Sequence, residues 1–191
     1  MDRSAGRLWA PWRMEYIRKA ENEARRGARK AGSNGGRRTT RSLGKHEPRV
    51  APGECLFCLL RKPRDDRRDL VLLRRPQAFL MLNRFPYNPA HLMVAVARHV
   101  ASFGELTAEE WRDLGDLTGL AERALASEYR PHGVNYGANL GRVAGAGFPG
   151  HLHLHLVPRW NGDTNFMPTV ADTKVLPESL SRTWSRLRRA L

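Results

Sequence analysis

Three histidines fall within five positions of one run, His-Leu-His-Leu-His-Leu-Val-Pro, at residues 151–158. In an extended strand successive side chains point to opposite faces, so His151, His153 and His155 are predicted to share one face and three leucines the other. The leucine face can pack on a core, which leaves three imidazoles on an exposed face. Protonated imidazoles would repel one another there, so we expect at least some to stay neutral and to act as ligand, base or nucleophile. A surface strand that is histidine-rich by chance is the weaker interpretation, because the whole chain holds seven histidines.

The two cysteines form a second candidate site, a Cys-Leu-Phe-Cys pair at Cys55 and Cys58. Two cysteines are too few for the disulfide framework of a secreted protein, and this spacing is typical of a metal or redox pair. A zinc site needs four ligands, and His99 and His151 are the candidates for the other two. A redox pair is disfavoured because no thioredoxin-like βαβ pattern surrounds it. Two buried free thiols remain the other alternative.

The elements that must position these residues follow from patterning. Thr107 and Glu110 form a capping box that opens a helix running to about residue 127. Strands in runs with one long helix between them indicate an α+β fold with an antiparallel sheet. The predicted strands are 70–73, 78–82, 91–97, 133–139 and 151–158, and the other predicted helices are 8–23 and 177–191. The strand at 91–97 is continuously apolar and is therefore predicted to be central.

Composition limits the class of protein. A chain of 191 residues suits one domain, and 41% hydrophobic residues suffice for a core. No apolar stretch approaches the roughly 20 residues of a membrane span, and the first residues lack the apolar segment of a signal peptide. With so few cysteines, the sequence predicts a cytoplasmic protein without membrane contact.

The net charge of +14 is concentrated in residues 18–50, which carry eleven Lys or Arg against three Glu. This stretch is rich in glycine and has almost no large apolar side chain, so we interpret it as a flexible insertion between residues 1–17 and 51–191. The alternative is an arm that contacts nucleic acid or another polyanion by counterion release. No aromatic residue is interleaved with the charge, which weakens that alternative.

The histidine strand resembles the active-site strand of the histidine triad (HIT) family of nucleotide hydrolases and transferases. Further similar blocks are Leu-Trp-Ala-Pro-Trp-Arg-Met-Glu-Tyr at 8–16, Asn-Arg-Phe-Pro-Tyr-Asn-Pro-Ala-His-Leu-Met at 83–93, Asn-Leu-Gly at 139–141, Ala-Gly-Ala-Gly at 144–147, and 158–168. They resemble a bacterial branch that cleaves dinucleoside polyphosphates such as diadenosine tetraphosphate. The resemblance implies a HIT domain at 51–191, anchored by 1–17, with a five-stranded antiparallel sheet, one long helix and a C-terminal helix. It also implies a homodimer that continues the sheet.

The same resemblance implies roles for individual residues. His153 would be the nucleophile that takes a nucleoside monophosphate as a covalent phosphoramidate, with His155 at the phosphate or leaving group. His151 would be a further catalytic histidine of the triad, and His91 would hydrogen-bond near His151 or support the triad. Zinc would be structural, because a closed set of four ligands leaves no position for water. The implied ligands are Cys55, Cys58, His99 and His151. The implied substrate contacts are Asn83 at the ribose, Asn139 and the amides of Ala146 and Gly147 at the phosphate, Trp160 over the pocket or in the core, and Phe79 and Leu80 beside the adenine.

Two positions, 146 and 147, bear on whether water or phosphate attacks the phosphoramidate in the second step. Phosphorylase-type relatives tend to have a second Gly and a Ser where this chain has Ala146 and Gly147, so one phosphate donor is missing. This narrowly favours hydrolysis over phosphorolysis, which would give ADP and ATP. Two further alternatives are a nucleoside phosphoramidase and a zinc-stabilised nucleic-acid-binding protein that uses residues 18–50. A Walker-type enzyme is disfavoured, because the sequence has no Gly-Lys-Ser/Thr.

Overall fold

The computed structural model describes residues 54–163 and 177–191. Every described residue belongs to one compact unit, Leu43–Leu191. The expected N-terminal helix, the anchor at 1–17 and the basic insertion at 18–50 lie outside the described residues, as do residues 164–168 of the block at 158–168.

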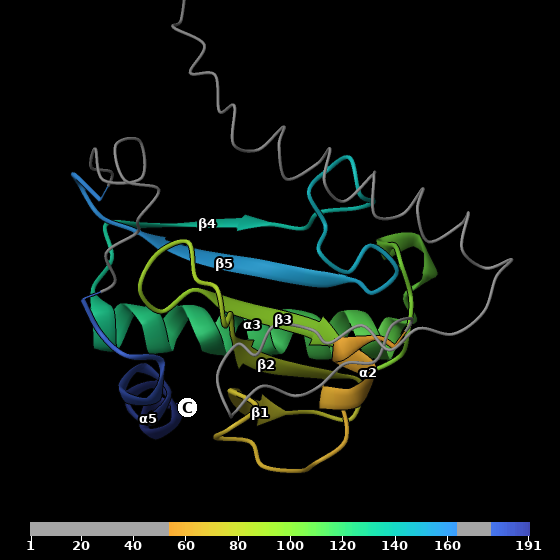
Figure 1. Ribbon diagram of the computed structural model, residues 1–191, viewed down its shortest axis with the longest axis horizontal. Coiled ribbons are helices and arrows are strands. Elements are labelled where there is room, and N and C mark those ends of the chain that lie inside the picture. Colours follow the sequence, from red (N-terminus) through yellow and green to blue (C-terminus); the bar gives the residue numbers. More distant parts are fainter. Residues whose placement is uncertain (1–53, 164–176) are drawn as a thin grey trace, which may run out of the picture. The chain divides into compact units, whose positions relative to one another are not determined.

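Five strands form one antiparallel sheet in the order β1-β2-β3-β5-β4 (Figure 1). The strands are β1 Val71–Arg74, β2 Ala78–Leu82, β3 Leu92–Val96, β4 Gly133–Gly137 and β5 His153–Arg159. The α+β fold with a five-stranded antiparallel sheet is therefore confirmed, and β3 is central as its apolar run predicts. One boundary matters for the site: β5 begins at His153, so His151 precedes the strand and does not lie in it.

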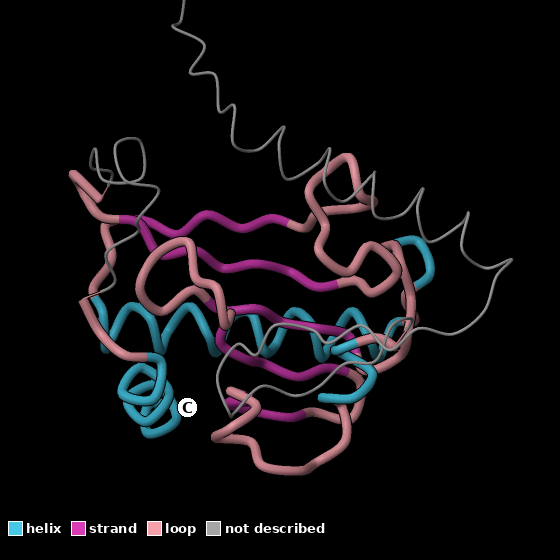
Figure 2. Tube along the Cα trace, viewed as in Figure 1, coloured by secondary structure: helices cyan, strands magenta, loops and turns pink. Residues whose placement is uncertain are grey.

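The long helix α3, Ala108–Tyr129, covers one face of the sheet and passes behind the strands in Figures 1 and 2. Its predicted capping box is present: the Thr107 hydroxyl accepts from the Glu110 amide, and the Glu110 carboxylate accepts from the Thr107 amide. It ends at Arg130, whose φ of 45° is left-handed. The C-terminal helix α5, Leu180–Ala190, packs on α3 and β1. Both helices were expected from the sequence.

Apolar side chains form a core on each face of the sheet. The larger core joins the α3 face of the strands to α3 and α5. The smaller core holds Phe79, Met81, Met93 and Ala95 from the sheet, packed under a short helix, α2 (Leu56–Leu60). Phe79 and Leu80 are 2% and 0% exposed, one in each core, so the expectation that they flank the adenine is wrong. Consecutive strand residues point to opposite faces, and here both faces are buried.

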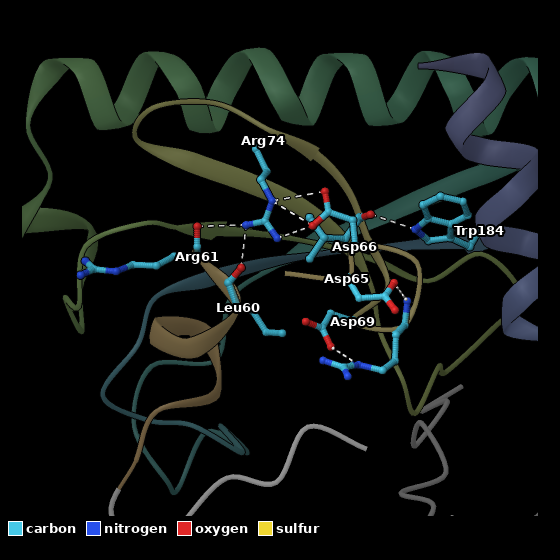
Figure 3. Close-up of polar contacts among 9 residues, drawn as sticks. Leu60, Arg61, Asp65, Asp66, Asp69, Arg74 and Trp184 are labelled. Carbon is cyan, nitrogen blue, oxygen red and sulfur yellow. Dashed lines mark hydrogen bonds and ion pairs between the residues drawn. The ribbon is translucent and has the colours of Figure 1, made fainter. Parts of the chain in front are cut away.

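The helix α2 was not predicted. It has five residues and no side-chain cap, and a helix this short is not stable in isolation. It is fastened to the sheet by Arg74, whose guanidinium donates to the carbonyls of Leu60 (2.6 Å) and Arg61 (3.0 Å) and pairs with Asp66 (2.6 Å) (Figure 3). These long-range bonds supply what the local sequence lacks.

Candidate active site and metal centre

Register places the histidines on the α2 face of the sheet. In the pairing of β3 with β5, His153 lies opposite Ala95 and His155 opposite Met93, and both partners belong to the smaller core. His151 and His153 are 2% and 6% exposed, and His155 is half-buried. The shared face is as predicted for His153 and His155, whereas His151 lies just before the strand, and the expectation that the face is exposed is wrong. Phe57 of α2 and the loop before β3 cover it, and neither cover is visible in the alternation of the strand itself.

His153 is held in one tautomer. Its Nδ1 donates a hydrogen bond to the carbonyl oxygen of His151 at 2.8 Å, which leaves Nε2 with its lone pair. Burial lowers the pKa of His153, so the ring is neutral at neutral pH. The ring stacks on Phe57, with centroids 4.6 Å apart and planes 30° apart. A neutral, oriented imidazole with a free nitrogen is what a nucleophile requires.

His155 is oriented through His91, which is fully buried. The Tyr87 amide donates to His91 Nδ1 at 3.1 Å, so the proton of His91 must sit on Nε2, which donates to His155 Nδ1 at 2.9 Å. The His155 proton is then on Nε2. Burial, followed by the nearby His153, lowers the pKa of His155 to about 4. His91 thus makes its triad contact with His155, where the sequence predicted either a hydrogen bond near His151 or support of the triad.

Four side chains converge on a candidate metal centre. The ligand atoms of Cys55, Cys58, His99 and His151 all lie within 4.8 Å of one another. The Cys55 sulfur is 3.2 Å from His151 Nδ1, and the Cys58 sulfur is 3.2 Å from His99 Nδ1. His151 donates from Nε2 to the Val96 carbonyl at 2.7 Å, which directs its Nδ1 lone pair at the sulfurs.

The donor set fits a tetrahedral metal ion. Two sulfurs and two imidazole nitrogens are a common ligand set for structural zinc. Burial, followed by the contact with Cys55, raises the pKa of the Cys58 thiol, so in the absence of metal this thiol holds its proton. Gly150 borders the site, where a Cβ would stand 3.3 Å from His99 Nε2. The sequence therefore identified a set of four residues that the fold brings together from three segments.

The expected substrate contacts lie at two ends of the histidine row. The Asn83 amide group approaches His91 Nδ1 at 3.4 Å, while its oxygen accepts from the Phe85 amide at 2.9 Å and closes a local turn. Asn139 lies in the loop before His151, where its amide makes a 3.5 Å contact with the Gly145 carbonyl. The Ala146 amide donates within this loop to Gly141, Gly147 is exposed, and Trp160 is half-buried beyond β5. Within the described residues, no hydrogen bond joins a triad histidine to any of the four residues Asn139, Ala146, Gly147 and Trp160.

Two aromatic residues at the site were missed. Phe57 contacts both His153 and His151, and Tyr87 packs over His91 at 4.7 Å and His155 at 6.1 Å while staying 52% exposed. Two positions in the sequence could have indicated them: Phe57 lies between the two cysteines, and Tyr87 lies within the block at 83–93.

Comparison with known proteins identifies the family. A model of the HIT domain matches residues 64–162. AP-4-A phosphorylase of Mycobacterium tuberculosis (strain ATCC 25618 / H37Rv) is 36% identical over 177 residues, which cover 93% of this chain and 80% of that protein. The chain belongs to the HIT family. It is a HIT enzyme of the hydrolase or phosphorylase kind.

Solved structures agree on the HIT fold. A zinc-bound histidine triad family protein from Mycobacterium smegmatis has a TM-score of 0.55 at 21% identity, covering 71% of this chain and 91% of that one. Plasmodium falciparum diadenosine triphosphate hydrolase has a TM-score of 0.52 at 17% identity, covering 66% and 76%. In the described part of this HIT enzyme, no helix is long and apolar enough to cross a membrane.

Proposed function

We propose that this HIT enzyme cleaves dinucleoside polyphosphates, with diadenosine tetraphosphate as the representative substrate, through a covalent nucleotide on His153. The observation that carries the proposal is the pair of fixed tautomers. His153 presents a lone pair on Nε2, and His155, whose ring centroid is 4.9 Å away, carries its proton on Nε2. A nucleophile and a hydrogen-bond donor thus lie side by side.

In the first step the Nε2 lone pair of His153 forms an N–P bond to the α-phosphorus. The P–O bond to the departing oligophosphate breaks, and its electron pair leaves on that oxygen. His155 donates from Nε2 to the departing oxygen and offsets its charge. Attack by an acceptor then forms a new P–O bond, and the electron pair of the N–P bond returns to His153. Both rings are neutral at the start because burial lowers the pKa of each.

We propose phosphate as the acceptor. The relative that is 36% identical over 93% of this chain is named AP-4-A phosphorylase, and this outweighs the narrow preference for water drawn from Ala146 and Gly147. Asn139, the loop amides at Ala146 and Gly147, and Trp160 are the residues we assign to the phosphate and nucleotide, and Asn83 to the ribose. The loop of residues 139–147 is largely exposed, and the Ala146 amide, which donates to the Gly141 carbonyl at 3.3 Å, would exchange that carbonyl for the anion.

We propose zinc as the metal held by Cys55, Cys58, His99 and His151. A zinc-bound HIT structure from Mycobacterium smegmatis and the two-sulfur, two-nitrogen donor set support this assignment. A four-ligand zinc site contributes folding free energy and fixes the segments that supply its ligands.

We also propose a homodimer that continues the sheet at β4. This strand is an edge and is largely exposed, whereas the other edge, β1, packs against α5 and accepts a hydrogen bond from Trp184. An exposed edge strand is a template for pairing with a second chain. A cytoplasmic location and a polyanion contact through residues 18–50 stay predictions from the sequence.

Product analysis tests the proposed reaction. The protein is incubated with diadenosine tetraphosphate, with and without millimolar phosphate, beside a His153→Ala control. Phosphate-dependent formation of ADP and ATP is expected. Formation of AMP and ATP regardless of phosphate would instead make water the acceptor. Failure to cleave the dinucleotide, with release of a nucleoside monophosphate from a phosphoramidate, would contradict the proposed substrate.

A further inference from the structure

Phe57 packs against both His153, the proposed nucleophile, and His151, a proposed metal ligand. Its ring centroid is 4.6 Å from that of His153, with planes 30° apart, and 5.0 Å from that of His151. The side chain is 2% exposed, and Phe148 packs edge-on against it at 5.7 Å. Phe57 therefore fills the space between α2 and the histidine row.

The nucleophile needs a second constraint beyond its hydrogen bond. The bond from His153 Nδ1 to the His151 carbonyl fixes the tautomer, but one bond at one ring atom does not prevent the plane of the imidazole from tilting about it. A flat ring stacked on the imidazole opposes that tilt. Since Nε2 must align with a phosphorus atom, small errors in its direction reduce the rate of attack.

The helix that carries Phe57 is too short to hold this position by itself. Its N-terminal end is Cys55, whose sulfur is 3.2 Å from His151 Nδ1, and Cys58 lies next to Phe57 in the metal centre. Its C-terminal end is held by Arg74, which donates to the Leu60 and Arg61 carbonyls (Figure 3). The helix is thus tied at both ends to groups far away in the sequence.

We propose that Phe57 is a positioning residue that sets the plane of the His153 imidazole, and that the metal centre and Arg74 together hold α2 so that Phe57 keeps this contact. The inference rests on the proposed role of His153. The four metal ligands take no part in the reaction under this proposal. Their loss nevertheless disturbs His153, because α2 then no longer holds Phe57 in place and because His151 supplies the carbonyl that accepts from His153.

Phe57→Leu tests the proposal, with Phe103→Leu as the control. Phe103 packs against the core on the opposite face of the sheet, stacks on Trp111 and, within the described structure, makes no ring contact with a histidine or with Arg74. For Phe57→Leu we expect kcat to fall by about 10-fold to 100-fold with KM within about twofold, since orientation and not binding is lost. For Phe103→Leu kcat stays close to that of the wild type, although both variants lose stability.

A direct readout of the ring separates this proposal from the proposed reaction. The Cε1–H NMR signal of His153, assigned by its loss in His153→Ala, is expected to move downfield in Phe57→Leu because ring-current shielding is removed, and to stay in place in Phe103→Leu. Zinc content, measured by elemental analysis, stays at the wild-type level in both. The NMR signal does not depend on turnover. Unimpaired activity of His153→Ala would therefore refute the proposed reaction, while the effect of Phe57 on the His153 ring could still be measured.

Two results would overturn the positioning role: wild-type kcat in a folded Phe57→Leu protein, or equal losses of kcat in the two leucine variants. If Phe57→Leu does not fold, Arg74→Lys takes its place. In Arg74, Nε and Nη2 pair with Asp66 while Nη1 donates to the two carbonyls, and the single nitrogen of a lysine cannot keep both sets of bonds although it keeps the charge. This variant is expected to move the same His153 signal, and an unmoved signal with unchanged kcat would equally refute the proposal.

Discussion

At the residue scale, backbone groups decide which nitrogen of each imidazole is available. In His151 the Val96 carbonyl accepts from Nε2 and frees Nδ1, which faces the cysteines. In His153 the His151 carbonyl accepts from Nδ1 and frees Nε2. In His91 the Tyr87 amide donates to Nδ1 and commits Nε2 to His155. Chemically identical side chains thereby present different nitrogens, which suits the proposed roles of metal ligand for His151, nucleophile for His153 and relay for His91.

Substitution of His91 tests the relay. His91→Ala removes the donor to His155 Nδ1, so the His155 proton is no longer confined to Nε2, and we expect kcat to fall by about 10-fold to 100-fold. His132→Ala is the control, because His132 accepts from the Asn161 amide outside the triad. Steady-state kinetics on both variants measures the effect. Equal activity of His91→Ala and wild type would remove His91 from the mechanism.

Acid should destabilise the fold through His155. Its folded-state pKa is about 4, below the ordinary value of about 6.5. Between these two values the unfolded chain binds a proton that the folded chain does not, so stability is lost as pH falls from about 6.5 to about 4. Urea unfolding at several pH values is expected to show this decline, with a smaller slope in His155→Gln. An identical slope in the variant would show that His155 does not contribute.

At the scale of elements, much of the sheet and of the site could be predicted. The alternation of His and Leu predicted which histidines share a face, and the capping box predicted the start of α3. Both patterns depend only on residues close together in the sequence. The helix α2 and the burial of His153 could not be predicted, because both depend on contacts between distant parts of the chain. Arg74 donates to the Leu60 carbonyl of α2, and Phe57 of α2 stacks on His153. Phe79 and Leu80 were misassigned to the nucleotide because apolar strand residues carry no mark of which layer covers them.

The cap of α3 gives a stability prediction at this scale. Thr107→Ala removes the hydroxyl that accepts from the Glu110 amide and should lower the free energy of unfolding by about 1 kcal/mol. Thr118→Ala, in the middle of the same helix, is the control, since its hydroxyl bonds only to the Leu114 carbonyl and alanine favours the helix. Denaturant unfolding compares the two. A smaller loss for Thr107→Ala than for Thr118→Ala would contradict the capping role.

At the scale of the whole molecule, the metal centre joins parts of the chain that the family match separates. The HIT match begins at residue 64, after Cys55 and Cys58, while His99 and His151 lie inside it. The segment that carries both cysteines, α2 with its N-cap residue Cys55, lies outside the matched region. The proposed zinc ion would hold it to His99 and His151 inside that region. The sequence predicts a structural metal, whose loss lowers thermal stability more than it lowers the chemistry. The contacts of Phe57 with His151 and His153 are the route by which we propose that the metal also affects the chemistry.

Metal removal tests this coupling. We expect one zinc per chain by elemental analysis, and Cys55→Ser is expected to lose the metal and to lower the melting temperature. Its kcat should fall as well, in protein that remains folded at the assay temperature. Protein purified without stoichiometric zinc would contradict the assignment of the metal.

The covalent nucleotide on His153 is the central claim, and intact-mass spectrometry of rapidly quenched protein tests it most directly. Wild-type enzyme mixed with diadenosine tetraphosphate should carry the added mass of one adenosine monophosphate, mapped to the peptide that contains His153. His153→Ala should lack the adduct and lose turnover on the order of 10³-fold or more. An adduct that persists in this variant, or turnover at the wild-type rate without His153, would contradict the account.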